Sequence, residues 1–417
     1  MKKNLKKVDL TVLQLIKEEE KRQIEGLEMI PSENYTSAAV MEAMGSVLTD
    51  KYSEGFPRKR YYGGNDVIDK VEELAQKRAL QLFKLSPKIW HVNVQPYSGS
   101  PANMAVYFGL LSFGETIMGM KLSDGGHLTH GHPKVTYSGT AYNSVQYGTG
   151  KTGIIDYDEV EKLALKHKPK IIISGYSAYP RKIDFKRFKE ISKKVGAILM
   201  VDMAHIAGLI AGGVHPTPFP YADIVTTTTH KTLRGPRGAI IFCRQKHAQA
   251  IDKAVFPGLQ GGPHDHQTAA IAVALKEANS VSFKKYAWEI VKNCQTLASE
   301  LMKRGFVLSS GGTDNHLCLL DLRKKGIGGK EAQEALEQAG IYVNKNTIPF
   351  DPNPPWKPSG IRLGTPALTS RGMKEHEMVK IGGWIAQVLD EPTNKKKIKS
   401  IRIQVKKLCQ NFPVPGI

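Results

Sequence analysis

Cysteine is scarce in this chain of 417 residues. It has four, Cys243, Cys294, Cys318 and Cys409, which lie far apart, with no C-x-x-C pair among them. Four cysteines in a chain of this length, without a C-x-x-C pair, do not indicate a disulfide-rich scaffold or a cysteine-ligated zinc site, and no metal site is expected. We expect free thiols in a reducing compartment, the cytoplasm.

Long hydrophobic runs are also missing. The longest, such as residues 206–214, have about nine residues and are broken by glycine, whereas a membrane-spanning helix needs about 20. The N-terminal stretch carries Asp9, Gln14 and glutamates at 18–20, which leave no apolar core for a secretory leader. It predicts an amphipathic helix that begins after Asp9 and ends at Gly26. We therefore expect a soluble protein.

Acidic residues are outnumbered, with 39 Asp and Glu against 59 Lys and Arg, a net charge of +20. Such an excess can indicate binding to nucleic acid or to a membrane surface. The lysines concentrate near the two ends of the chain, whereas the middle is mixed in sign, which favours a solvated basic surface. A nucleic-acid-binding protein stays open as a remote alternative, but nucleic acid is not expected as the main partner.

Short aliphatic runs alternate with helical segments from about residue 92. Runs at 171–175, 197–201, 223–228 and 239–242 predict strands, and residues 184–195 predict a helix capped by Asp184 and stopped by Gly196. This alternation predicts an α/β fold with a large, mostly parallel sheet covered on both faces.

Long helical patterns follow to about Arg304, and then come short elements at 307–309, 317–322, 330–339 and 341–344. These predict a smaller C-terminal α/β domain. The expected division is an N-terminal helical arm at 1–50, a large domain at 51–280 and a small domain at 281–417.

Three polar motifs fall where the carboxyl ends of strands would form a ligand crevice. Lys231 follows the run 223–229; desolvated there, it would have a lowered pKa and could form a Schiff base, with a surface lysine as the alternative. Asp202 ends an earlier strand, where a carboxylate either pairs with a cation such as a pyridinium nitrogen or caps the next helix. Ser100 is predicted to cap a helix whose first residue is Pro101, a start suited to binding phosphate. Together they indicate pyridoxal 5′-phosphate.

Ten segments in this order are similar to those of the serine hydroxymethyltransferases, also called glycine hydroxymethyltransferases: SENYTS, EGFPRKRYYGGN, VQPYSGSPAN, GGHLTHG, VDMAHIAGL, VTTTTHKTLRGPRG, FPGLQGGP, SGGTDNHL, VNKN and SGIRLGTP. The resemblance runs from about residue 24 to the C-terminus. It implies the aspartate-aminotransferase-like architecture of fold type I pyridoxal-phosphate enzymes and a homodimer with shared active sites. It also implies reversible transfer of a hydroxymethyl group between serine and tetrahydrofolate, giving glycine and 5,10-methylenetetrahydrofolate, in one-carbon metabolism and amino-acid biosynthesis.

The resemblance also implies cofactor contacts. Lys231 forms the Schiff base, Asp202 pairs with the pyridine nitrogen and His127 stacks on the ring. The other implied cofactor-binding residues are Tyr52, Gly99, Ser100, Ser177, His205, Thr228, Arg237, Gly261 and Gly262, with Tyr52, Gly261 and Gly262 reaching across the dimer interface.

Substrate contacts follow from the same similarity. Arg362 holds the carboxylate of serine, and Glu54, with a pKa raised by partial shielding, exchanges protons where serine meets folate. The remaining implied substrate and catalytic residues are Ser32, Tyr62 and His205 for the substrate and Lys231, His230 and Tyr62 for catalysis. Folate-binding residues are Glu54, Tyr61, Leu122, Gly126, His127, Leu128, Asn346 and Trp356, with Pro355 nearby.

A threonine aldolase-like or other fold type I enzyme is the nearest alternative, because its cofactor residues would look similar. Glu54, the Tyr61 and Tyr62 pair and the GGHLTHG segment favour the folate-dependent reaction. Pro31, Pro101 and Arg234 depart from the family pattern, and Pro101 removes one amide donor from the predicted phosphate site.

Overall fold

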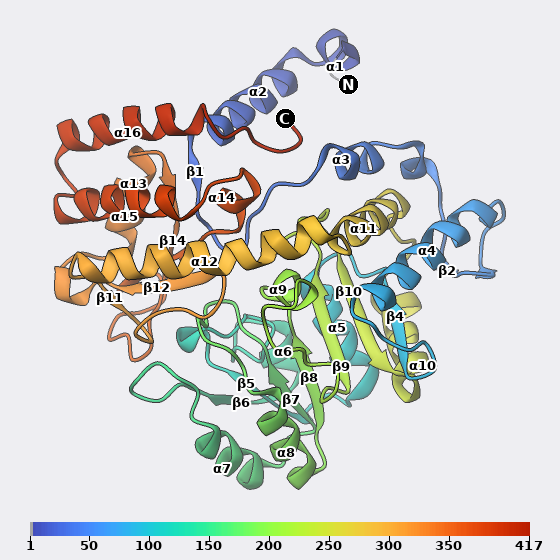
Figure 1. The fold of residues 1–417 in the computed structure, drawn as a ribbon. Coiled ribbons are helices and arrows are strands. Elements are labelled where there is room, and N and C mark those ends of the chain that lie inside the picture. Colours follow the sequence, from blue (N-terminus) through green and yellow to red (C-terminus); the bar gives the residue numbers. More distant parts are fainter. Residues whose placement is uncertain (1–2) are drawn as a thin grey trace.

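The computed structural model describes residues 3–417, and its central feature is a sheet of seven strands in the order β4-β10-β9-β8-β7-β5-β6 (Figure 1). Neighbours from β6 through β9 pair in parallel, whereas β10 runs antiparallel to β4 and β9. The strands are β4 (Trp90–Asn93), β5 (Thr116–Met120), β6 (Asn143–Tyr147), β7 (Ile171–Ser174), β8 (Ile198–Asp202), β9 (Ile224–Thr228) and β10 (Ala239–Arg244). The expected α/β fold is confirmed, and each expected strand between residues 171 and 242 is present, its ends shifted by one or two residues at most.

Apolar side chains pack on both faces of this sheet. Neighbouring residues of a strand point to opposite faces. On β7, Ile172 belongs to one buried cluster together with Phe188, whereas Ile171 and Ile173 belong to another together with Val106. The helices of this part of the chain are α4 (Asp66–Leu82), α5 (Gly99–Leu110), α6 (Tyr137–Ala141), α7 (Tyr157–His167), α8 (Phe185–Val195), α9 (Ala207–Ala211), α10 (Ala248–Lys253) and α11 (Asp265–Ala278).

Helix α8 has the two ends that the sequence predicts. Asp184 accepts a hydrogen bond from the backbone N–H of Arg187 at 2.9 Å, and Gly196 ends the helix with a φ of 69°. A carboxylate satisfies a free amide at a helix start, and glycine adopts positive φ without strain. Both predictions are confirmed.

A second, smaller sheet of four antiparallel strands has the order β11-β12-β15-β14. Its strands are β11 (Val307–Leu308), β12 (Leu317–Asp321), β14 (Asn344–Asn346) and β15 (Gly360–Gly364), and its helices are α12 (Val281–Lys303), α13 (Gly329–Gln338), α14 (Pro366–Ser370), α15 (Glu375–Asp390) and α16 (Lys395–Cys409). The prediction of a single strand at 341–344 is wrong. Its first residues form β13 (Ile341–Tyr342), which pairs with β1 (Leu27–Glu28), and the chain passes to the other sheet after the buried Val343.

Helix α12 joins the two cores. In Figure 1 it runs lengthwise between the C-terminal helices and the seven-stranded sheet. Phe283 and Ile290, in its first half, pack in the core of the large sheet, and Leu297 and Leu301, in its second half, pack in the core of the small sheet. The domain limits at residues 50 and 280 stay predictions.

Helix α2, near the N-terminus, packs against the C-terminal helix α16. After α1 (Lys3–Val8), helix α2 (Leu10–Glu25) begins with Asp9 accepting from the N–H of Val12 at 2.9 Å and ends at Gly26, as the sequence predicts. The segment to residue 65 then forms α3 (Ala38–Met44), a short turn η1 (Val47–Asp50) and a hairpin of β2 (Gly55–Phe56) and β3 (Lys59–Arg60). Within residues 3–417, no helix combines the length and the apolar composition needed to span a bilayer.

Candidate active site

A cavity of about 270 Å³ lies where β8 and β9 end and α5 begins. Its lining brings together many residues that the sequence singled out: Ser32, Gly99, Ser100, His127, Ser177, Asp202, His205, Thr228, His230, Lys231 and Arg237. The carboxyl ends of parallel strands form the usual ligand crevice of such sheets. A cavity is therefore found at the sheet edge where the sequence placed the ligand crevice.

Lys231 follows β9 and projects its amine into this cavity. The Nζ atom donates a hydrogen bond to Oγ1 of Thr228 at 3.0 Å. Burial lowers the pKa of Lys231 from 10.5 to about 8; the carboxylate of Asp202 works against this shift, and the positive charges of Arg362 and Arg237 add to it. A surface lysine is excluded, and the amine is closer to its neutral, nucleophilic form than an exposed lysine would be.

Asp202 is the last residue of β8, and its carboxylate has three partners. Oδ2 accepts from Nδ2 of Asn103 at 2.9 Å and lies 3.0 Å from Nε2 of His130, while Oδ1 accepts from the N–H of Ala204. Burial alone would raise the pKa of Asp202, but the hydrogen bond and charge of His130, with His127 and Asn103, hold it well below its ordinary value. Helix α9 starts with Ile206 as its N-cap, so Asp202 does not cap it.

The start of α5 offers unpaired backbone amides to the cavity. The helix begins at Gly99, with Ser98 in extended conformation before it, so the N-cap predicted at Ser100 is wrong by two residues. The side chain of Ser98 makes no capping bond, and the first amides of a helix have no intrahelical acceptor. A Cβ on Gly99 would lie 2.7 Å from Cγ2 of Thr228, so only glycine fits without displacement.

The ring of His127 lies at the wall of the cavity. Its Nδ1 is 2.7 Å from Oγ1 of Thr129. Burial and the nearby His130 lower the pKa of His127 to about 4. The pKa of His230, beside Lys231, is lowered to about 3 by burial and by the charges of Lys231 and Arg237. Both rings are therefore neutral near pH 7.

Arg362 is a buried cation that does not line the cavity but contacts Ser177, which does. It lies on β15, is 8% exposed, donates from Nε to Oδ1 of Asn344 at 3.0 Å, and donates from Nη1 to the backbone oxygen of Ser177. Burial lowers its pKa to about 10. No ion pair is found for it among residues 3–417, so the surface ion pair that an isolated arginine would make is absent there. A buried positive charge without a counter-charge is suited to an anionic ligand.

Another group of expected site residues lies apart from this cavity. Tyr52, Gly261 and Gly262 line a separate cavity of about 460 Å³, and the hydroxyl of Tyr52 donates to Glu54 at 3.3 Å. Tyr61 and Tyr62 are exposed, and Glu54 and both tyrosines are absent from the lining of the Lys231 cavity. Within one chain, these residues do not meet Lys231.

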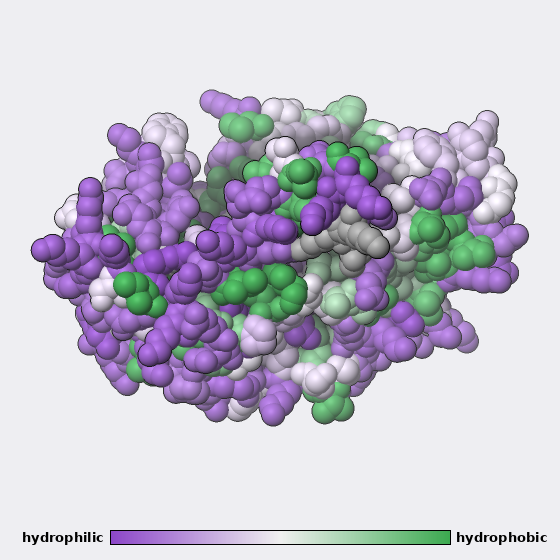
Figure 2. All heavy atoms as spheres, turned by 90° about the horizontal axis from the view of Figure 1, so that it is seen from above, coloured by the Kyte–Doolittle hydropathy of each residue, from purple (hydrophilic) through white to green (hydrophobic). Residues whose placement is uncertain are grey.

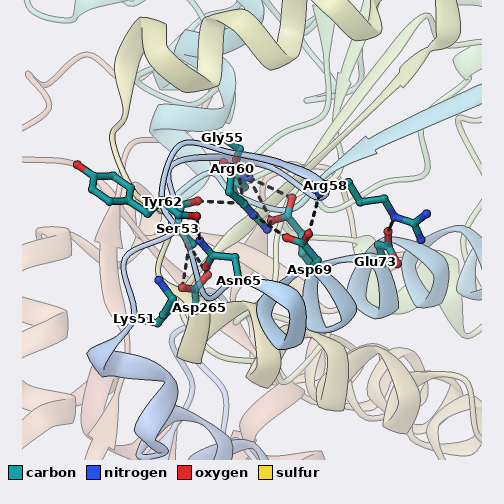
Figure 3. A network of polar contacts seen from close by, with 12 residues as sticks. Lys51, Ser53, Gly55, Arg58, Arg60, Tyr62, Asn65, Asp69, Glu73 and Asp265 are labelled. Atoms are coloured by element: carbon teal, nitrogen blue, oxygen red, sulfur yellow. Dashed lines mark hydrogen bonds and ion pairs between the residues drawn. The ribbon is translucent and has the colours of Figure 1, made fainter.

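The segment 51–65, which carries these side chains, is held firmly by Arg60 (Figure 3). The buried Arg60 pairs with Asp69 at 2.8 Å and with Glu72 at 2.7 Å, both on α4. It also donates to the backbone oxygens of Ser53 and Gly55, on either side of Glu54. In Figure 3 the ring of Tyr62 points away from this network. Hydrogen bonds on either side of Glu54 therefore hold its backbone, and its half-buried side chain lies against Tyr52.

The expected folate contacts are not gathered in one described cavity. Leu128 and Trp356 are exposed, Pro355 is exposed, Leu122 is half-buried, and Asn346 donates from its amide to the backbone oxygen of Thr347. Gly126 is buried, and a Cβ there would lie 2.0 Å from the oxygen of Met120. Of the expected folate residues, His127 alone is in the lining of the Lys231 cavity.

Several partners of site residues were not predicted individually. They are Asn103 and His130, which contact Asp202, Asn344, which contacts Arg362, and His316, which contacts His205. All four lie within segments that carried the family resemblance, SGSPAN, GGHLTHG, VNKN and SGGTDNHL. Their place in these segments was the one sequence signal that could have identified them as site residues.

Two of the departures from the family pattern have local contacts. The guanidinium of Arg234 lies 4.1 Å from the ring centroid of Tyr286, a cation–π contact. Pro31 is buried against Gly364. Both positions are therefore accommodated by packing.

The cavity fits pyridoxal phosphate. The free amides of α5, with Ser100 and Arg237 beside them, suit a phosphate; the ionised Asp202 suits a pyridinium; and the buried amine of Lys231 suits an aldehyde. The flat, neutral ring of His127 suits stacking.

Comparison with known proteins agrees with this chemistry. The family model described as serine hydroxymethyltransferase matches residues 5–385. Three curated relatives named serine hydroxymethyltransferase are each 56% identical: one from Desulfotalea psychrophila over 413 residues, one from Acidothermus cellulolyticus over 416 and one from Koribacter versatilis over 415. The matches cover 98–99% of this chain and 96% of each relative.

Proposed function

The chain belongs to the serine hydroxymethyltransferase family, and we propose that the cavity around Lys231 is where it performs that family's reaction. The enzyme transfers the hydroxymethyl carbon of serine to tetrahydrofolate, giving glycine, 5,10-methylenetetrahydrofolate and water, and the reaction is reversible. Pyridoxal phosphate, when bound, supplies an aldehyde for the amino group and a ring that withdraws electrons from the reacting carbon. The threonine aldolase-like alternative and the nucleic-acid-binding alternative are not favoured.

In this proposal the cofactor is held at both ends. Gly99, Ser100 and Arg237 bind the phosphate, and Asp202, supported by His130 and Asn103, keeps the ring nitrogen protonated. His127 lies against the ring, Ser177 and His205 lie near the phenolic oxygen, and Thr228 orients the amine of Lys231. The hydrogen bonds of Asp202 and the lowered pKa of Lys231 support these assignments.

Arg362, with Ser32, binds the carboxylate of serine. The observation that carries this proposal is the buried guanidinium with no anionic partner among the described residues. A planar guanidinium matches a carboxylate with two parallel hydrogen bonds, which lysine cannot make.

Steady-state kinetics of Arg362→Lys test this assignment. We expect the KM for serine to rise by about tenfold or more, because one charge-assisted hydrogen bond contributes about 1.5–3 kcal/mol. Arg323→Lys is the matched control, since Arg323 pairs with Asp321 at the surface. An unchanged KM for serine in Arg362→Lys would refute the role.

Glu54 moves a proton between the serine hydroxyl and folate, with Tyr62 beside it. His230 acts next to Lys231, and Tyr61, Leu122, Gly126, Leu128, Asn346 and Trp356 contact folate. The fixed backbone of segment 51–65 supports a precise position for Glu54.

A homodimer completes each site. The partner supplies Tyr52, Glu54, Gly261 and Gly262 to the Lys231 cavity, which is supported by the separation of these residues from Lys231 within one chain. The N-terminal helices also leave large apolar side chains exposed: Val8, Leu10, Val12, Leu15 and Ile16. The face in Figure 2 is mostly hydrophilic, with apolar groups interrupting it. Exposed apolar side chains that gather into one patch commonly mark an interface, and a second copy of this chain is the proposed occupant.

The cytoplasm is the proposed location. All four cysteines are free and buried, which suits a reducing compartment. The excess of lysine then forms a solvated surface that draws in anionic folates.

A further inference from the structure

Two histidine rings meet behind the cavity, one from each sheet. His205 follows β8 of the seven-stranded sheet and lines the cavity, and His316 immediately precedes β12 of the four-stranded sheet. Nδ1 of His205 lies 3.1 Å from Nε2 of His316. The residues are 5% and 0% exposed. Their contact joins the small sheet directly to a residue of the site.

Both rings are neutral near pH 7. Burial, followed by the positive charges of Lys231 and Arg362, places the pKa of His205 well below its ordinary value. Burial and the charge of Arg362 lower the pKa of His316 to about 3. Between two neutral imidazole nitrogens one must donate and the other accept. Two arrangements are therefore possible, with either ring as the donor.

The second ring nitrogen of His316, Nδ1, shows which of the two rings is the donor. Its Nδ1 is buried and has no hydrogen-bond partner anywhere in residues 3–417. If His205 were the donor, this Nδ1 would carry a buried hydrogen without an acceptor. If His316 donates from Nε2, Nδ1 carries only a lone pair. Orphaned buried N–H groups are rarer than under-satisfied acceptors, which selects His316 as the donor.

We propose that His316 is a positioning residue that donates from Nε2 to Nδ1 of His205 and so keeps the hydrogen of His205 on Nε2. His205 then presents an N–H to the cavity, where the cofactor and the serine carboxylate, as assigned in the proposed function, place anionic oxygens. The small sheet thereby sets which nitrogen of a cavity histidine carries the proton. No histidine needs to be charged for this arrangement.

Nitrogen NMR of the cofactor-free chain tests the tautomer directly. The full chain is labelled with ¹⁵N at histidine, and the signals of His205 are identified by their loss in His205→Asn. We expect a protonated Nε2 and an unprotonated Nδ1 for His205. The reverse assignment would overturn the proposal. Neither cofactor nor substrate is present, so this outcome is independent of the proposed function.

Two variants then test whether His316 is the cause. In His316→Gln the amide nitrogen can take the place of Nε2, whereas His316→Phe has a ring without a donor. We expect His316→Gln to keep the tautomer of His205 and to bind pyridoxal phosphate within about twofold of the original chain, and His316→Phe to lose the tautomer preference and bind it about tenfold more weakly. His376→Gln, at an exposed position on α15, is the control for replacing a histidine by glutamine away from the cavity. An unchanged tautomer in His316→Phe, or equal effects of the two variants, would contradict the assignment.

Discussion

At the scale of single residues, burial and neighbouring groups shift the pKa values of charged side chains in and beside the cavity. Lys231 is pushed toward its neutral amine, while Asp202 is kept ionised by His130 and Asn103. Arg362 stays a cation with only neutral acceptors. These states are complementary to an aldehyde, a pyridinium nitrogen and a carboxylate, which is the set that the family's cofactor and substrate carry.

The lowered pKa of Lys231 predicts how covalent capture of the cofactor depends on pH. Between about 8 and 10.5 the folded chain has already lost the proton that an exposed lysine would still hold. The rate at which the cofactor-free chain captures pyridoxal phosphate should therefore rise about tenfold per pH unit below pH 8 and level off above it. Stopped-flow absorbance measures this rate, with Lys231→Ala as the control that shows no covalent capture. A rate that keeps rising through pH 10 would contradict the shift.

The positions of Lys231 and Asp202 could be predicted from the sequence because Asp202 ends one recognisable buried strand and Lys231 follows another, and neighbouring parallel strands end at the same edge of the sheet. Asn103 and His130 could not be assigned as partners of Asp202, because their contacts depend on how α5 and the segment 126–131 are placed in three dimensions. The cap at Ser100 was mispredicted because Ser98 and Ser100 are equally good candidates from composition, and only the backbone conformation separates them.

At the scale of elements, Arg60 holds the hairpin β2–β3 and the loop around Glu54 to helix α4. Removing its charge leaves Glu72 buried without a cation, since both side chains are 3% exposed. We expect Arg60→Met to lower the free energy of unfolding by about 3–5 kcal/mol, the usual effect of breaking a buried ion pair. Urea denaturation measures it. Arg58→Met is the matched control: Arg58 pairs with Glu73 in solvent, so its loss should change the free energy of unfolding by about 0–1 kcal/mol. Equal losses in the two variants would contradict this role of Arg60.

Arg371 fastens the N-terminal helix to the C-terminal one. Its buried guanidinium donates to the backbone oxygens of Gln23, Ile24 and Gly26 at the end of α2, and to those of Cys409 and Phe412 at the end of α16. Lysine cannot reach all five, so Arg371→Lys should speed amide exchange about tenfold or more in the last turns of both helices. Hydrogen exchange read by mass spectrometry checks this, with the surface variant Arg304→Lys as control. Unchanged exchange in α2 would rule out the fastening role.

Elements with clear periodicity were predicted well, and those fixed by tertiary pairing were not. The two ends of helix α8 could be predicted because Asp184 and Gly196 are residue types that start and end helices. Residues 341–344 look like one strand by composition, but their pairing partners lie in two different sheets. The local sequence carries no signal for this change of partner.

At the scale of the whole molecule, the residues that the family resemblance assigns to one site lie in two places on the chain. One holds Lys231, Asp202 and Arg237, and the other holds Tyr52 and Gly261. The sequence could not predict this separation, because motif order carries no distances. The proposed dimer, which joins the first place on one protomer to the second on its partner, would account for this separation.

Subunit complementation measures this central claim most directly. Lys231→Ala and Glu54→Gln should each be nearly inactive alone, but a mixed dimer contains one site with both residues intact. An equal mixture, after subunit exchange confirmed by mass spectrometry, should recover about a quarter of the original activity in forming glycine from serine and tetrahydrofolate. A mixture of Lys231→Ala with Asp202→Asn should recover none, because those two residues belong to the same cavity. Failure of the first mixture to recover activity would contradict the shared site.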